Sequence, residues 1–467
     1  MHPIRANRAW IAILALPLLP HAAPGQLASD ATLRPPLTPI HSMGDYSFLV
    51  DPAQRTDIWD RLKFIRLGDS IFLTLGAEYR LEHEVFRTSN WGAGPQDGTG
   101  YLLQRIMPHA CIRMGSALRV FVSLKFDDVF GRNGGPRPGF DRNRADIHEG
   151  FVDLGTGTAS VTARLGRQEL IFGAGKFTSN NEGVNVRLSF DAARVTLKNH
   201  GWESNLFAGR PVSNRPGAFD DTPNHRQAFW GVYATAPPLR QMRVDGYYLG
   251  LDTKLAQYQQ GQGHELRHTV GSRFYTKPAP GGIDFDGDAA WQFGTFGPDT
   301  IRAWTVATET GYRWGFVRFR PRVAMKADVA SGDGNPSDHT LGTFNPLFPK
   351  GGYFGKMVLG GPYNFYDLHP VLQLAPSRTV TLQADWDWFW RQSIRDGIYG
   401  GGFRLRDGLA SRARAIGSQG NMEVRWSLDR HLTLVLNLAT FLPGQFLKET
   451  GPAKTVLFAN SGFTYRF

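Results

Sequence analysis

The chain has 467 residues, of which 54 are glycine and 12% are aromatic, and its formal net charge is +11. This length suits two or three soluble domains or one large barrel, and the positive charge indicates an anionic partner. A single cysteine, Cys111, excludes an intramolecular disulfide framework and a cysteine-based zinc site. The mean hydropathy of −0.30 is compatible with a transmembrane barrel, because only alternate strand positions face lipid.

The N-terminus has the pattern of an export signal. Arg5 and Arg8 precede the apolar run Trp10–Leu19, and small residues follow it. The run is too short for a membrane-spanning helix, which needs ~20 residues. We therefore predict a signal peptide over residues 1–28, a proline-rich periplasmic lead-in over 29–60, and a barrel over 61–467.

Strand-type alternation begins at Ile71. From there to Glu82 the apolar residues occupy every second position, with Glu78 and Arg80 among the residues between them. Tyr101–Met114 and Leu118–Asp127 alternate in the same way. A period of two places the two sets on opposite faces of a strand, so we expect one face toward lipid and the other toward a lumen.

The predicted strands are joined by connections that alternate between long and short. Gly131–Asn143, Gly173–Arg187 and Val329–Phe365 are long, Thr253–Glu265 is of medium length, and Gly155–Thr158, Asn199–Gly201 and Asp429–Arg430 are short. Short periplasmic turns and long extracellular loops are typical of outer-membrane barrels, which have an even number of strands. The pattern predicts an all-β, antiparallel transmembrane barrel of about 18 strands in the outer membrane of a Gram-negative bacterium.

A basic stretch, Val317–Asp328, suggests what the lumen carries. Its apolar residues alternate with Arg318, Arg320, Arg322 and Lys326, which predicts one strand with a basic face. The same space is expected to hold Arg80, Arg105, Arg113, Arg119, Arg194, Lys198, Arg267 and Arg273. Interleaved acids, Asp385 among them, would hold the arginines and weaken the binding of a polyanion. We predict an arginine-lined lumen for an anionic solute.

The late strands carry membrane signals. Trp386, Trp388 and Trp390 share one face of the run Val380–Arg391, as in an interfacial aromatic girdle. Phe467 ends the chain, with aromatic residues two and four positions before it. Both features favour a barrel over a soluble sandwich.

Three motifs have a reading as a metal or catalytic site. His264–His268 matches H-E-x-x-H, but its glycine-rich, strand-like surroundings would hold the two imidazoles ~13 Å apart. Asp333, Asn335 and Asp338 are more typical of Asx turns than of a calcium site. Asp385 and Asp387 could form a glycosidase pair, but lumen-facing charges are the favoured reading. We predict no catalytic residue, no metal and no cofactor.

Five motifs resemble the alginate export family of outer-membrane porins, in an order that spans roughly residues 60–467. They are L-G-R-Q-E-L at Leu165–Leu170, R-L-S-F-D at Arg187–Asp191, S-G-D-G at Ser331–Gly334, the long motif Thr343–Gly355, and F-W-R-Q-S-I-R-D-G-I-Y at Phe389–Tyr399. The resemblance implies an eighteen-stranded barrel whose electropositive constriction passes a polyuronate outward. It also implies the constriction candidates Arg80, Arg105, Arg167, Glu169, Arg194 and Arg391.

Three functions remain open at this point. The first is outward passage of an acidic polysaccharide, with outer-membrane lipid around the barrel, a possible periplasmic export scaffold, and no nucleic-acid partner. The second is anion-selective uptake of small carboxylates or oligouronates. The third is an outer-membrane hydrolase or lyase.

Overall fold

The structure is a computed structural model that describes residues 34–155, 160–277, 279–357 and 359–467. The predicted signal peptide and most of the predicted turn at Gly155–Thr158 lie outside these residues. The chain divides into two units, Met1–Pro36 and Leu37–Phe467. Only the last three residues of the first unit are described, and all that follows concerns the second.

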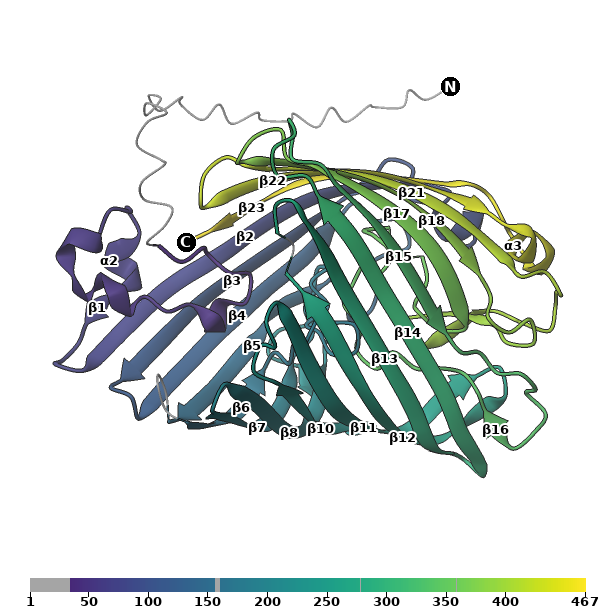
Figure 1. The fold of residues 1–467 in the computed structure, drawn as a ribbon, viewed down its shortest axis with the longest axis horizontal. Helices are drawn as coiled ribbons and strands as arrows, with labels where there is room; N and C mark the ends of the chain where they lie inside the picture. Colours follow the sequence, from purple (N-terminus) through teal and green to yellow (C-terminus); the bar gives the residue numbers. More distant parts are fainter. Residues whose placement is uncertain (1–33, 156–159, 278, 358) are drawn as a thin grey trace, which may run out of the picture. The chain divides into compact units, whose positions relative to one another are not determined.

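Eighteen strands form one closed antiparallel sheet (Figure 1). In chain order they are β2 (Ile71–Arg87), β3 (Tyr101–Met114), β4 (Leu118–Phe130), β5 (Asn143–Leu154), β6 (Val161–Gln168), β7 (Phe190–Asn199), β8 (Trp202–Ser213), β10 (Gln227–Thr235), β11 (Met242–Tyr258), β12 (Gly261–Thr276), β13 (Gly282–Phe296), β14 (Asp299–Arg313), β15 (Arg322–Ala330), β17 (Phe365–Leu374), β18 (Val380–Trp390), β21 (Ala415–Ser427), β22 (Leu432–Pro443) and β23 (Val456–Arg466).

The barrel closes between its first and last strands. Tyr79 of β2 is paired with Tyr465 of β23, and Ala77 and Phe467 exchange two backbone hydrogen bonds of 3.0 and 3.1 Å. Closure leaves no open sheet edge, which a structure that spans lipid requires. The predicted fold is confirmed. No helix among the described residues is both long and apolar enough to cross a membrane.

The predicted strand faces are confirmed in the clearest runs. On β2 the side chains of Glu78 and Arg80 are buried inside the barrel, and on β3 Arg105 is fully buried while Ile106 is 36% exposed. On β18 Asp387 is buried and Trp388 is exposed. Apolar residues therefore face outward and charged residues face the lumen, as the period of two requires.

Two predicted boundaries are wrong. Val317–Pro321 is not strand: β15 begins at Arg322, and the residues before it form a turn in which Phe319 and Arg320 have positive φ. The predicted connection Thr253–Glu265 is largely strand, since β11 extends to Tyr258 and β12 begins at Gly261.

The lead-in folds as short elements beside the first and last strands. They are η1 (His41–Met43), η2 (Ser47–Val50), η3 (Pro52–Gln54), α2 (Asp60–Lys63) and β1 (Ile65–Arg66). Trp59 stacks on Phe467 with ring centroids 4.0 Å apart and donates to the Tyr465 hydroxyl at 2.8 Å. The aromatic C-terminus is thus held by the N-terminal segment.

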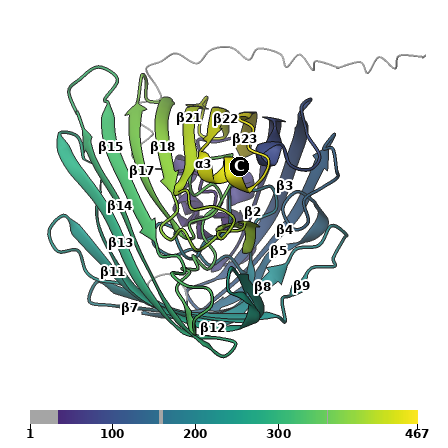
Figure 2. The same cartoon turned by 90° about the vertical axis from the view of Figure 1, so that its right-hand side faces the viewer.

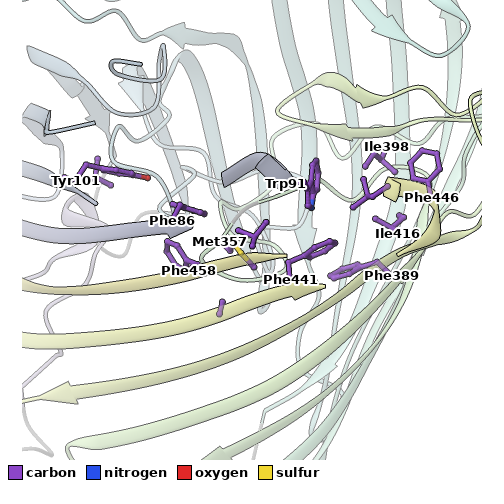
Figure 3. Close-up of a cluster of buried hydrophobic side chains, with 14 of the residues drawn as sticks. Phe86, Trp91, Tyr101, Met357, Phe389, Ile398, Ile416, Phe441, Phe446 and Phe458 are labelled. Carbon is purple, nitrogen blue, oxygen red and sulfur yellow. The ribbon is translucent and has the colours of Figure 1, made fainter. Parts of the chain in front are cut away.

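The remaining elements belong to long connections. They are η4 (Ser89–Gly92), β9 (Thr222–Pro223), β16 (Thr340–Leu341), the hairpin β19 (Ile398–Gly400) and β20 (Phe403–Arg406), and α3 (Gln445–Thr450). Figure 2 shows several of these connections inside the ring of strands. Trp91, Met357, Phe389, Ile398, Ile416, Phe441 and Phe446 pack there as a buried apolar cluster (Figure 3). The lumen at the long-loop end is therefore filled by packed side chains.

Candidate functional site

A row of charged residues, four arginines and one aspartate, crosses five adjacent strands on the lumen side, close to the short-turn end. Register pairs Arg113 of β3 with Arg119 of β4, Arg119 with Asp153 of β5, Asp153 with Arg164 of β6, and Arg164 with Arg194 of β7. We call these five residues the basic arc. It runs around the barrel wall, whereas the sequence suggested a basic row along one strand.

The charges in the basic arc are unequal. Asp153 is 3.3 Å from Arg119 and accepts bonds of 2.6 and 2.9 Å from Arg164. Arg113 donates only to a neutral acceptor, the Gly44 carbonyl, at 3.1 Å. Arg194 has no hydrogen-bond partner among the described residues, and its Nε is buried. Asp153 is therefore hydrogen-bonded to two of the four guanidinium groups. Arg113 lies near Asp45, and Arg194 near Glu149 and Glu203, but neither arginine is hydrogen-bonded to a carboxylate among the described residues, so both have donors available for an anion.

The basic arc lines a cavity of about 490 Å³. Ile40, Ser42 and Met43 of the lead-in also border the cavity, and Arg119 donates to the Ser42 carbonyl. Lys198, Glu169 and Glu203 complete its charged lining. Guanidinium groups bind carboxylates through paired hydrogen bonds, and low-dielectric walls strengthen that attraction. The cavity can therefore hold an organic anion.

Other predicted arginines anchor the connection between β6 and β7, residues 169–189. Arg80 donates to the Val184 carbonyl at 2.8 Å, and Arg105 donates to the Val184 and Asn185 carbonyls at 2.6 and 2.8 Å. Both side chains are buried. Their terminal guanidinium nitrogens bond to this connection, while Arg80 Nε lies 3.6 Å from Glu82 without a hydrogen bond, so these arginines fix a loop in the lumen.

Glu182 of this connection is the acid at the centre of the anchor. Arg105 lies 3.0 Å from its carboxylate, and Arg187 also binds it. Burial opposes ionisation of Glu182, but the guanidinium groups of Arg105 and Arg187 hold its pKa far below the usual range. Glu78 accepts from Arg105, Arg187 and Arg466 in the same cluster. The connection is thus held by a buried ionic network.

The connections after β15 and β18 are anchored by the same chemistry. Arg267 of β12 donates to Gln292 and to the Thr343 carbonyl. Arg391 donates only to backbone carbonyls of its own connection, those of Ile394, Asp396, Gly408, Ser411 and Ala413. Arg391 shapes a loop and has no donor directed at a solute.

The other predicted site residues are distributed around the barrel. Arg167 forms a two-bond pair with Asp191 at 2.8 and 3.1 Å, and Arg322 pairs with Asp284 and Glu309. Arg318 and Arg320 lie exposed in the turn before β15, so their predicted place on a lumen-facing strand is wrong. The remaining three are Glu169, which contacts His148 at 2.8 Å and lines the cavity, Asp385, which contacts His369 at 3.0 Å, and Lys326, which is paired in register with His369.

The motif readings agree with the local structure. His264 and His268 lie on strand β12, where His268 bonds the Tyr248 hydroxyl at 2.8 Å, so the helix that H-E-x-x-H chemistry needs is not formed. Asp333 accepts from the Asn335 amide and Asp338 from the Thr340 amide, and both form the predicted Asx turns.

Sequence reasoning missed Arg164 and Asp153 as site residues, and it missed the inward course of the loops. The alternation of Thr162 and Arg164 with apolar neighbours was a usable signal for Arg164. The five family-like motifs were another, because they flank or occupy the connections 169–189, 331–364 and 391–414.

These features define an outer-membrane barrel of the channel type. The family model described as "Alginate export" matches residues 72–457, and the chain belongs to the alginate export family. The family and the fold place the protein in the outer membrane of a Gram-negative bacterium. A search of curated proteins gave no match to the chain.

Solved structures with a similar fold include three Pseudomonas aeruginosa proteins. OpdR shares 13% identity at a TM-score of 0.53, over 87% of this chain and 97% of that one. OprE shares 11% identity at a TM-score of 0.56, over 86% of this chain and 99% of that one. OpdK, solved with vanillate, shares 10% identity at a TM-score of 0.55, over 84% of this chain and 98% of that one. At these identities the likeness concerns the fold alone.

Proposed function

We propose that the protein is a channel that passes an anionic polysaccharide of the polyuronate type outward, with the basic arc as its periplasmic anion-binding site. The observation that carries this proposal is the arc itself: four guanidinium groups, two of them without a hydrogen-bonded carboxylate among the described residues, around a cavity of about 490 Å³. Membership of the alginate export family supports a uronate as the repeating unit.

The charge pattern suits passage better than tight storage. Each uronate residue carries one carboxylate, and Arg113 and Arg194 offer charge at the two ends of the arc. Asp153 and Glu203 lie among the basic groups and weaken the binding of an anion. Conduction needs binding strong enough to admit the solute and weak enough to release it, so a mixed lining favours a chain that moves from one site to the next.

The packed lumen at the long-loop end indicates the direction in which a polymer passes through the barrel. The connections 169–189 and 331–364 are held inside the lumen by buried charges, and a passing polymer has to displace part of them. We infer that a polymer enters at the basic arc from the periplasmic side and that its insertion opens the loops. Directionality then comes from the machinery that delivers the polymer, with a periplasmic export scaffold as the expected partner.

Uptake of small carboxylates is the second candidate function. The cavity has the volume of a small-molecule site, and the similarly folded OpdK was solved with vanillate. Swelling of proteoliposomes distinguishes the two. Rapid entry of an aromatic carboxylate with exclusion of oligouronates would favour uptake. The family is one of export, so the enzymatic alternative has no support among the comparisons.

The direct test is block of channel current by defined oligouronates in planar bilayers. Oligouronates added at the short-turn side should block wild-type current at lower concentration than neutral oligosaccharides of equal length. The double substitution Arg113→Gln plus Arg194→Gln should raise the blocking concentration at least tenfold. Arg318→Gln plus Arg320→Gln removes the same charge from the exposed turn and should leave block unchanged. Equal block by neutral and acidic sugars would refute the proposal.

A further inference from the structure

A second cluster of charged side chains lies on the lumen wall away from the basic arc, on β17, β18 and β15. Asp367 and His369 of β17 and Asp387 of β18 each offer one ligand atom, and these three atoms lie within 4.8 Å of one another. All three side chains are buried, and Asp387 is 0% exposed. The arrangement unites one imidazole and two carboxylates in a water-poor place.

Asp387 is the observation that separates this cluster from an ordinary acidic patch. Neither oxygen of its buried carboxylate has a hydrogen-bond partner among the described residues. Its nearest cationic group is the His369 ring, with Nδ1 at 3.2 Å from Oδ2. A fully buried carboxylate without hydrogen bonds is strongly unfavourable unless a cation compensates it. The positive charge beside Asp387 therefore has to come from a protonated His369 or from a bound cation.

The groups on the Nε2 side of His369 orient its ring for metal coordination. Asp385 Oδ1 lies 3.0 Å from Nε2, and Asp385 is itself held by Asn421 at 2.7 Å and Gln383 at 2.8 Å. A proton on Nε2 that is donated to Asp385 leaves the lone pair on Nδ1, the atom that faces Asp387. Metal-bound histidines are held in this way by a carboxylate on the far nitrogen.

The charge balance leads to the same conclusion. Asp328, Asp367, Asp385 and Asp387 are gathered here, and Lys326 is the cation paired in register with His369. Lys350 is a second ammonium group that interacts with Asp328. With a neutral imidazole and ionised carboxylates, four carboxylates face two ammonium groups, and a divalent cation would balance this excess of two negative charges.

We propose that Asp367, His369 and Asp387 bind one divalent first-row transition-metal ion, with Zn²⁺ as the best fit. A nitrogen ligand with two carboxylates suits zinc and disfavours calcium, which takes oxygen ligands only. Ligand atoms on one zinc lie ~3.3 Å apart, so the three groups need to close by a small side-chain movement. The proposal is independent of the anionic solute proposed above.

The second trio of acids in the barrel does not have these properties. Asp146, Asp220 and Asp221 also approach one another, but Lys125 lies 2.8 Å from Asp221, and the Arg215 amide donates to Asp221 at 2.7 Å. The Asp221 amide in turn donates to Asp146 at 2.9 Å. Protein donors already bind Asp146 and Asp221. Although Asp220 Oδ1 has no hydrogen-bond partner among the described residues, Asp220 is only half-buried, and the cluster contains no imidazole.

The test uses the purified full barrel in detergent after treatment with a chelator. Titration with Zn²⁺ by calorimetry should show one equivalent, and Co²⁺ should give the visible absorption of a low-symmetry site. His369→Ala and Asp387→Asn should each weaken binding at least 100-fold. Asp385→Asn should weaken it by roughly 10–100-fold, because it only orients the ring. His339→Ala removes a histidine from the exposed pair with Asp299 and should change nothing.

Folding is checked by the heat-dependent gel mobility of each variant. X-ray absorption of the zinc-loaded wild type needs no substitution and should show nitrogen and oxygen ligands. Sulfur ligation, which would identify Cys111, overturns the proposal. Equal Zn²⁺ affinity in the wild type and in Asp387→Asn also overturns the proposal. That result is expected if a protonated His369 is the only cation that this pocket accommodates.

Discussion

The ammonium group of Lys356, in the connection between β15 and β17, lies 3.0 Å from both carboxylate oxygens of Glu82 on β2, although the two residues are 274 positions apart in the chain. Lys356 also donates to the Gly183 carbonyl at 3.3 Å. One side chain therefore links two inward connections to the first strand of the barrel.

Lys356→Met should loosen this link. The substitution leaves the buried Glu82 carboxylate without its ammonium partner, which favours movement of both connections away from β2. We expect a larger mean conductance, or more frequent opening, in single-channel recordings. Lys448→Met changes an exposed lysine on α3 and should reproduce wild-type traces. Identical conductance in both variants would show that the contact does not restrain the lumen loops.

Arg105→Met should lower the stability of the barrel strongly. Arg105 is fully buried, and its removal leaves the Asn185 carbonyl without its side-chain donor and takes one of two basic partners from both Glu182 and the Val184 carbonyl. Removing one partner of a buried ion pair costs about 3–5 kcal/mol. Denaturant unfolding in detergent measures this loss. Arg66→Met breaks the exposed pair with Asp69 and should have little effect. Comparable losses in the two variants would contradict the anchoring role.

The connection after β15 should be more stable at pH 5 than at pH 7. Burial, opposed by a hydrogen bond from the Asn335 amide, raises the pKa of Asp333 to about 6. A raised pKa means that the folded loop binds a proton that the unfolded loop releases, so stability falls as the pH rises through 6. Hydrogen exchange across residues 331–343, corrected for the intrinsic rate, should be slower at pH 5. In Asp333→Asn the difference should disappear, and a difference that persists would assign it to other groups.

Trp59→Ala should weaken the junction between the two chain ends. The substitution removes the stacking on Phe467 and the hydrogen bond to the Tyr465 hydroxyl. Together these contacts are worth about 1–3 kcal/mol. The midpoint of denaturant unfolding should fall accordingly, whereas Ile58→Ala, at a side chain that is 82% exposed, should leave it unchanged. An unchanged midpoint in Trp59→Ala would show that the lead-in does not support the last strand.

The strands were predictable because a barrel wall obeys a local rule. Ile71–Glu82 and Val380–Arg391 alternate apart from one aromatic residue in each polar set, Phe72 and Phe389, and period two alone assigns their faces. The same rule failed at Val317–Pro321, where V-R-F-R-P alternates by composition but Phe319 and Arg320 adopt positive φ. Gly315 and Pro321 favour a turn there, and a search for alternating residues alone takes no account of turn-forming residues.

The lumen contents were not predictable in this way. Arg80 and Arg105 were correctly placed on the inner face, yet their partners, Glu182 and Val184, lie about 80 to 100 residues away in a connection with no periodicity. Whether an inward arginine meets solute or a folded loop depends on these distant contacts. The basic arc was not predictable for a related reason. Its five residues lie on five different strands, and the register between strands, which the sequence of one strand does not give, decides which residues are adjacent.

The measurement that tests the central claim most directly is the reversal potential of the channel in a planar bilayer under a gradient of potassium chloride. We predict that the wild type selects chloride over potassium, that Arg113→Gln plus Arg194→Gln abolishes most of this selectivity, and that Arg318→Gln plus Arg320→Gln retains it. Cation selectivity of the wild type, or equal selectivity in both double variants, would contradict an anion path along the basic arc.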